Sequence, residues 1–156
     1  METIGLGHYL EDLSEGRRFR TVGRTVTETD IVNFINTIGM TEVLFTNTEF
    51  LHGEAGYEGR LAPGSLVFCF VEGLLAQSAH QGTGLAFLGL DLKILRPTFA
   101  GDTIHVEVEV LESRPSETRP GRGIVRTSNK VINQRDEMVM QYTPVRMIKR
   151  RPKVAG

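Results

Sequence analysis

The sequence has little cysteine, little net charge and no long apolar run. Cys69 is the single cysteine among 156 residues, so an intrachain disulfide is excluded. A formal net charge of −1 gives no attraction toward nucleic acids or acidic substrates. The most apolar stretch, 64–80, is shorter than a bilayer span of about 20 apolar residues and contains Glu72. We therefore expect neither a nucleic-acid partner nor a membrane partner.

The composition is that of an ordinary globular protein, with 40% hydrophobic and 24% charged residues. This length predicts a single domain over residues 1–156, with its core at about 12–148 and a solvated basic tail at 149–156. The first residues, METIGLGHYL, lack the basic flank and apolar core of a signal peptide. We therefore expect a cytoplasmic protein.

The stretch that opens at Pro63-Gly64-Ser65 predicts a helix over 64–80 that is apolar nearly all the way round. Such a helix is expected to be buried on every face, with Cys69 as a small hydrophobe inside it. His80 is interpreted as a favourable charge at its C-terminal end. The N-terminal end presents free backbone N–H groups and a partial positive charge, which suit a carbonyl oxygen or a phosphate.

A second helix is predicted over 28–38. Thr27 and Asp30 resemble a capping box at its start, and Gly39 stands where a left-handed C-cap residue belongs. One apolar stripe follows the helical period. The stripe consists of Ile31, Phe34, Ile35 and Ile38. Residues 40–62 show no sustained period and are expected to form a functional or mobile loop.

The remaining patterns predict strands. A first strand is expected within 17–26, and longer ones at 85–95, 103–112, 123–131 and 137–148. In 103–112, valine and isoleucine alternate with histidine and glutamate, which is typical of a strand with one buried face. The order of elements indicates an α+β fold in which a curved antiparallel sheet wraps around one long buried helix.

Several short motifs recur in a familiar order. They are Leu13-x-x-Gly16, Thr29-Asp30-Ile31-x-x-Phe34, Arg60-Leu61-Ala62-Pro63-Gly64-Ser65-Leu66, Gly89-Leu90-x-Leu92-x-x-Leu95-Arg96-Pro97, Gly101-Asp102-Thr103, Gly123-Ile124-Val125 and Val131-x-Asn133-Gln134. Through them the chain resembles the hotdog-fold MaoC-like dehydratases, which include the (R)-specific enoyl-CoA hydratases. The resemblance spans about residues 12–148.

This resemblance implies hydration of a trans-2-enoyl thioester, or the reverse dehydration of a 3-hydroxyacyl thioester. The chemistry needs a donor for the thioester oxygen, a base for water and an acid for the α-carbon. The resemblance assigns the donor to Gly64 and Ser65, which follow Pro63 at the start of the helix, and it places all three residues in the substrate-binding site. It implies no cofactor and no metal, because the acyl-CoA or acyl carrier protein thioester is itself the substrate or ligand.

The sequence departs from the family where the acid–base pair belongs. The family has an Asp and, five residues later, a His, in a Gly-Asp-x-Asn-Pro-x-His pattern after the short helix. Met40 and Phe45 occupy these positions, and neither transfers a proton. Glu42 and His52 are the candidate replacements, as a carboxylate and an imidazole near the gap. Their alternative interpretations are a surface carboxylate and a solvent-exposed loop histidine.

Two further residues are candidates for substrate contact. Glu72 matches the place where some hotdog thioesterases carry a catalytic carboxylate, and its alternative roles are structural pairing or a place on an exposed rim. Arg96 either contacts the nucleotide end of CoA or builds a turn. Three functions therefore stay open: a hydratase or dehydratase of fatty acid metabolism, a non-catalytic acyl-thioester binder or partner subunit, and a thioesterase. The resemblance and the open sheet edges favour a homodimer or higher homo-oligomer.

Overall fold

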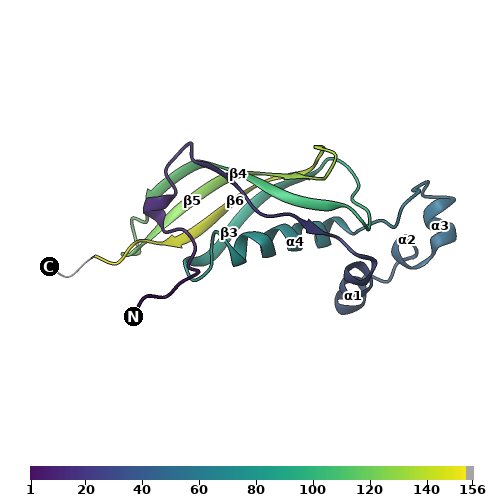
Figure 1. Cartoon of the computed structure of the whole chain (residues 1–156), viewed down its shortest axis with the longest axis horizontal. Coiled ribbons are helices and arrows are strands. Elements are labelled where there is room, and N and C mark those ends of the chain that lie inside the picture. The colour runs from purple at the N-terminus through teal and green to yellow at the C-terminus, as the bar shows by residue number, and fades with distance from the viewer. Residues whose placement is uncertain (154–156) are drawn as a thin grey trace.

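The computed structural model describes residues 1–153 and shows a curved antiparallel sheet lying over one long helix, α4 (Figure 1). The strand order is β1-β4-β5-β6-β3, and β2 pairs with β4. The elements in chain order are the 3-10 helix η1 (Leu10–Asp12), β1 (Arg18–Arg20), β2 (Arg24–Thr25), α1 (Glu28–Ile38), α2 (Val43–Thr46), α3 (Thr48–His52), α4 (Gly64–Gln77), β3 (Gly84–Ile94), β4 (Thr103–Pro115), β5 (Arg122–Ile132) and β6 (Met138–Lys149). The predicted fold class is confirmed.

The core lies between the concave face of the sheet and one side of α4. Every second residue is buried in β4 up to Val110 and throughout β5, so each strand presents one face to the helix, as the alternation predicts. The largest contributors are fully buried aliphatic and aromatic side chains. They include Leu66, Val71 and Leu75 from α4 and Val106, Val131, Met140 and Tyr142 from the sheet.

Only one side of α4 is covered, which corrects the expectation of burial on every face. The helix ends at Gln77, before the predicted end at residue 80. Its open side carries small residues about one turn apart, namely Ser65, Cys69, Gly73 and Ala76. Cys69 is exposed and is not the buried hydrophobe expected from its apolar neighbours. The physical reason is that one chain supplies one sheet, and that sheet covers a single side of the helix.

The segment before α4 is more ordered than its sequence indicates. The predicted capping box of α1 is confirmed, because the Thr27 hydroxyl accepts from the Asp30 N–H and the Asp30 carboxylate accepts from the Thr27 N–H. Gly39 adopts the predicted left-handed conformation. Residues 40–62 contain two short helices, and residues 17–26 form two short strands instead of one. Figure 1 shows α1, α2 and α3 gathered at the N-terminal end of α4.

The described part of the basic C-terminal run is exposed and forms ion pairs with the N-terminal segment. Arg150 Nε lies 3.0 Å from Glu11, and Arg151 Nη2 lies 2.6 Å from Asp12. These pairs join the last described residues to η1. Residues 154–156 of the predicted tail lie outside the described residues. Within 1–153, none of the helices combines the length and apolarity that crossing a membrane requires.

Candidate active site

An apolar cavity of about 320 Å³ opens beside the N-terminus of α4. Its size lies at the lower end of the range typical of small-molecule sites. Its walls are Phe45, Tyr57, Leu61, Ala62, Gly64, Val67, Ile94, Leu95, Arg96, Pro97, Thr98, Val139 and Met140. The cavity therefore joins the helix start to the end of β3 and to the segment that carries α2.

The helix start supplies the hydrogen-bond donors of this cavity. The Pro63 carbonyl accepts from the N–H groups of Leu66 and Val67, as a first helical turn does. Among the hydrogen bonds of residues 1–153, the N–H groups of Gly64 and Ser65 find no partner. A Cβ at position 64 would collide with the Ile94 side chain, so glycine keeps this end of the cavity open. The arrangement suits a carbonyl oxygen that gains negative charge.

The two positions where the resemblance places an Asp and a His are filled by packed apolar side chains. Phe45 is 6% exposed and forms part of the cavity wall. Its carbonyl accepts a 2.6 Å hydrogen bond from Arg60 Nη1, and the Arg60 guanidinium also pairs with Glu28 at 2.9 Å. Met40 packs against the main core. Phe45 therefore shapes the cavity, and neither Phe45 nor Met40 has a proton to transfer.

The structure does not bring Glu42 or His52 to the wall of this cavity. Glu42 is exposed at the N-cap position of α2. His52 is exposed too, and its Nδ1 lies 2.7 Å from the Tyr57 carbonyl oxygen. The imidazole borders a neighbouring cavity of about 520 Å³, and Phe45 stands between the two spaces because it lines both. Their catalytic assignment stays a prediction.

Arg96 lies in the wall of the α4 cavity with an exposed side chain, as a contact to substrate requires. Glu72 lies elsewhere, about two turns further along α4. Its Oε1 accepts from the Tyr142 hydroxyl at 2.7 Å and from Arg146 Nη2 at 2.5 Å. Burial, together with the Glu72 charge, raises the pKa of Tyr142 and keeps it a donor. Glu72 is therefore structurally paired.

Sequence reasoning missed a second cavity, of about 250 Å³, at the other end of α4. Glu72, His80, Phe87 and Arg146 contribute to its walls. Burial, with a smaller contribution from the Arg146 charge, lowers the pKa of His80 to about 4. The imidazole is thus neutral near pH 7, which corrects its interpretation as a charge at the helix end. Nothing in the sequence reveals this cluster, since Arg146 comes from the last strand.

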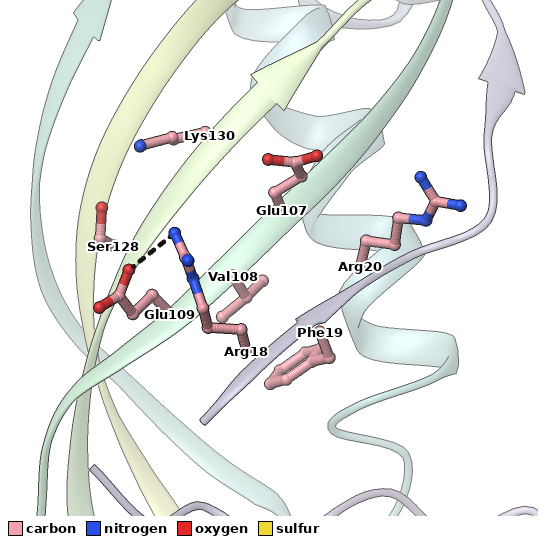
Figure 2. Close-up of a pocket in the computed structure, with 8 residues that line it drawn as sticks. All are labelled: Arg18, Phe19, Arg20, Glu107, Val108, Glu109, Ser128 and Lys130. Carbon is pink, nitrogen blue, oxygen red and sulfur yellow. Dashed lines mark ion pairs between the residues drawn. The ribbon is translucent and has the colours of Figure 1, made fainter. Parts of the chain in front are cut away.

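A further groove, of about 370 Å³, lies over the charged side chains of β1, β4 and β5 (Figure 2). Arg18 pairs with Glu109 at 3.3 Å, with side chains that are 73% and 42% exposed. Arg20, Glu107 and Lys130 occupy adjacent positions in the strand register. Opposite charges side by side in open solvent neutralise one another, so we assign this groove no function. Residues 1–153 contain no grouping of three His, Cys, Asp or Glu side chains able to hold a metal ion.

The curved sheet, the long helix that packs against it and the segment at the N-terminal end of that helix define a hotdog-fold protein. The FAS1-like dehydratase domain region family matches residues 14–142. The MaoC-like dehydratase from Rhodospirillum rubrum is 30% identical, with a TM-score of 0.78 over 94% of this chain and 99% of that one. The monoamine oxidase regulatory protein from Archaeoglobus fulgius is 31% identical, with a TM-score of 0.79 over 94% and 97%.

The double hotdog protein RV0216 from Mycobacterium tuberculosis is 22% identical, with a TM-score of 0.84 over 99% of this chain and 48% of that one, and it shares the fold. A search of the curated proteins finds no match. The chain belongs to the MaoC-like, FAS1-like dehydratase family of hotdog proteins. The predicted resemblance is confirmed.

Proposed function

We propose that the protein is a hydratase or dehydratase that acts on an enoyl or 3-hydroxyacyl thioester carried by CoA or acyl carrier protein. The observation that supports this proposal is the start of α4. There, the N–H groups of Gly64 and Ser65 have no partner among residues 1–153, and Gly64 lines an apolar cavity. A thioester oxygen at Gly64 and Ser65 would receive hydrogen bonds while the hydrocarbon part fills the apolar space.

The reaction follows from that placement. Water adds its oxygen to C3 of the enoyl group after a base removes a proton, and the double-bond electrons move onto the thioester oxygen. The partial positive charge of the α4 N-terminus stabilises this enolate. An acid then delivers a proton to C2, which completes the 3-hydroxyacyl thioester. Dehydration is the same path in reverse.

We propose Glu42, at the N-cap of α2, and His52, at the end of α3, as the acid–base residues. Purified protein is assayed by the absorbance of crotonyl-CoA and of longer and branched enoyl-CoAs. Glu42→Ala and His52→Ala are expected to abolish turnover, whereas Glu49→Ala, an exposed carboxylate of the same segment, leaves it unchanged. Turnover that survives both variants contradicts this assignment, and the absence of turnover on every substrate contradicts the enzyme proposal.

A non-catalytic acyl-thioester binder, or a partner subunit of an active homologue, is the second candidate. One observation favours it: among residues 1–153, the only ionisable side chains in the cavity wall are Tyr57 and Arg96. This function predicts calorimetric binding of acyl-CoA without turnover, or capture of a hotdog partner. The third candidate, a thioesterase, predicts CoA release from saturated acyl-CoAs that Glu72→Ala abolishes. The pairing of Glu72 with Arg146 gives it no support.

We also propose that two copies associate through β3, within the cytoplasm. β3 is the last strand of the sheet order, so one of its edges has no neighbouring strand within residues 1–153. Several of its large apolar side chains are exposed to solvent, with Leu88 51% and Ile94 57% exposed. An open apolar edge of this length favours pairing with another strand. Size exclusion with light scattering is expected to give a dimer or larger species, and a clean monomer contradicts it.

A further inference from the structure

The cavity at the start of α4 and the cavity at its far end both border β3. β3 runs beside α4 in the opposite direction. Ile94 therefore lines the cavity that contains Gly64, and Phe87 lines the one that contains Glu72. From residue 64 to residue 72 the helix rises by about 12 Å. This distance suits an extended acyl chain of medium length.

An apolar strip of β3, formed by Leu90 and Leu92, lies in the chain between the residues that line the two cavities. In the strand register, Leu90 is opposite Pro144 and Leu92 is opposite Tyr142. Directly opposed residues point to the same face of a sheet, and Tyr142 is buried in the core beneath α4. Leu90 and Leu92 therefore point to the helix side as well, yet they remain 40% and 36% exposed. The strip thus offers hydrocarbon contact along the line from the thioester site to the far cavity.

The cavity at the far end of α4 has polar side chains in its wall. A plain hydrocarbon chain has no group that would form hydrogen bonds with them. Arg146 is 9% exposed, and its guanidinium lies 4.8 Å from the centre of the Phe87 ring. Within residues 1–153, one hydrogen bond engages this guanidinium, from Nη2 to Glu72. Arginine has five N–H donors, and a nearly buried guanidinium normally uses most of them. The side chain lines the cavity, so the remaining donors have space for an acceptor there.

The cluster is electrically balanced. Glu72 offsets the charge of Arg146, and both hydrogen bonds described for Glu72 end on Oε1, so Oε2 is available to accept another. His80 in the same wall is neutral near pH 7 because burial disfavours its charged form. A second carboxylate would meet the Glu72 charge at close range. An uncharged oxygen meets donors from Arg146 and an acceptor on Glu72 without that repulsion.

We propose that the acyl chain of the substrate lies along the β3 strip and carries an uncharged oxygen, a hydroxyl or carbonyl, at its far end. Arg146 and Glu72 receive this group. The inference rests on the proposed function, because it places the thioester at Gly64. It adds the chemical class of the chain terminus.

The test is calorimetric binding of three saturated acyl-CoA series of medium length, which differ only at the chain end: methyl, hydroxyl or carboxylate. The hydroxyl series is expected to bind about tenfold more tightly than the methyl series at the best length, since one hydrogen bond to a charged group contributes about 1.5 kcal/mol. Equal or weaker binding of the hydroxyl series overturns the inference. Tightest binding of the carboxylate series overturns the assignment of an uncharged oxygen.

A double variant tests the residues. Glu72→Leu with Arg146→Met replaces the ion pair by apolar groups and is expected to abolish the hydroxyl preference while methyl-series binding persists. The control variant, Arg18→Met with Glu109→Leu, removes an ion pair from the groove over β1, β4 and β5 (Figure 2) and is expected to keep the preference for the hydroxyl series. A preference that persists in a folded first variant contradicts the assignment. If that variant does not fold, the wild-type comparison alone decides. Binding of the methyl series without preference rejects this inference alone, whereas no binding of any series rejects the proposed function too.

Discussion

Removal of the Glu72 carboxylate is expected to destabilise the fold more than removal of the whole ion pair. In Glu72→Leu, Arg146 stays nearly buried without its charge partner, and Tyr142 loses the oxygen to which it donates. Breaking a buried pair typically costs about 3–5 kcal/mol. The Glu72 side chain is 20% exposed and that of Arg146 10%, so screening by solvent reduces the expected loss to about 2–4 kcal/mol.

The double variant Glu72→Leu/Arg146→Met removes both charges, so it is expected to lie within about 1–2 kcal/mol of the wild type. Arg146→Met alone leaves the carboxylate unpaired and is expected to resemble Glu72→Leu. Urea unfolding followed by circular dichroism gives the free energy of unfolding of each protein, provided that the denaturant slope stays constant. A loss below about 1 kcal/mol in both single variants, or losses that simply add in the double variant, would refute the reasoning.

Three further perturbations follow from the structure. Gly64→Ala places a methyl group against Ile94 and narrows the cavity, so acyl-CoA binding by calorimetry is expected to weaken about tenfold or more while the melting temperature changes little; unchanged affinity contradicts the cavity as the binding site. The folded-state pKa of His80 is about 4, below its ordinary value of 6.5, so the unfolded chain takes up the proton first and stability is lost as the pH falls from about 6.5 toward 4. Urea unfolding at a series of pH values measures this loss. His80→Gln is expected to reduce the change in the free energy of unfolding between about pH 6.5 and 4 by up to about 3 kcal/mol, and the same pH dependence in the variant contradicts the prediction. Burial opposes the charge of Asp102, but hydrogen bonds from Gln134, the Phe99 N–H and Arg135 outweigh it and lower the pKa of this carboxyl. Asp102→Asn is expected to cost about 1–3 kcal/mol at neutral pH, with a smaller cost under acid conditions, where protonation of the wild-type carboxyl removes the same stabilisation.

The sequence predicts most of the fold because its signals are local. The Thr27–Asp30 capping box, the left-handed Gly39 and the alternation in β4 each act over a few residues, so the pattern specifies the structure directly. The apolar stretch 64–80 wrongly predicts a helix that is buried on every face, because the extent of burial depends on how far the sheet curves around the helix. One chain covers one side of α4 and leaves Cys69 exposed.

Less of the candidate site than of the fold could be predicted from the sequence. The start of α4 follows from Pro63-Gly64-Ser65, and Gly64 lines the cavity beside it, whereas the role of these residues as oxyanion donors stays a prediction. The bond between Glu72 and Arg146 joins residues 74 positions apart, and no local pattern indicates such a contact. Phe45 lines two cavities, and its carbonyl accepts a hydrogen bond from Arg60, which lies 15 positions further along the chain, so no local pattern indicates this arrangement.

The most direct test is a crystal structure of the protein with a non-hydrolysable acyl-CoA analogue. The account predicts that the thioester oxygen lies within about 3 Å of the backbone nitrogen of Gly64 or Ser65, with the acyl chain directed along β3 toward Arg146. An analogue bound in the groove beside Arg18 and Glu109, or one whose thioester oxygen lies away from the start of α4, would contradict the proposed thioester site.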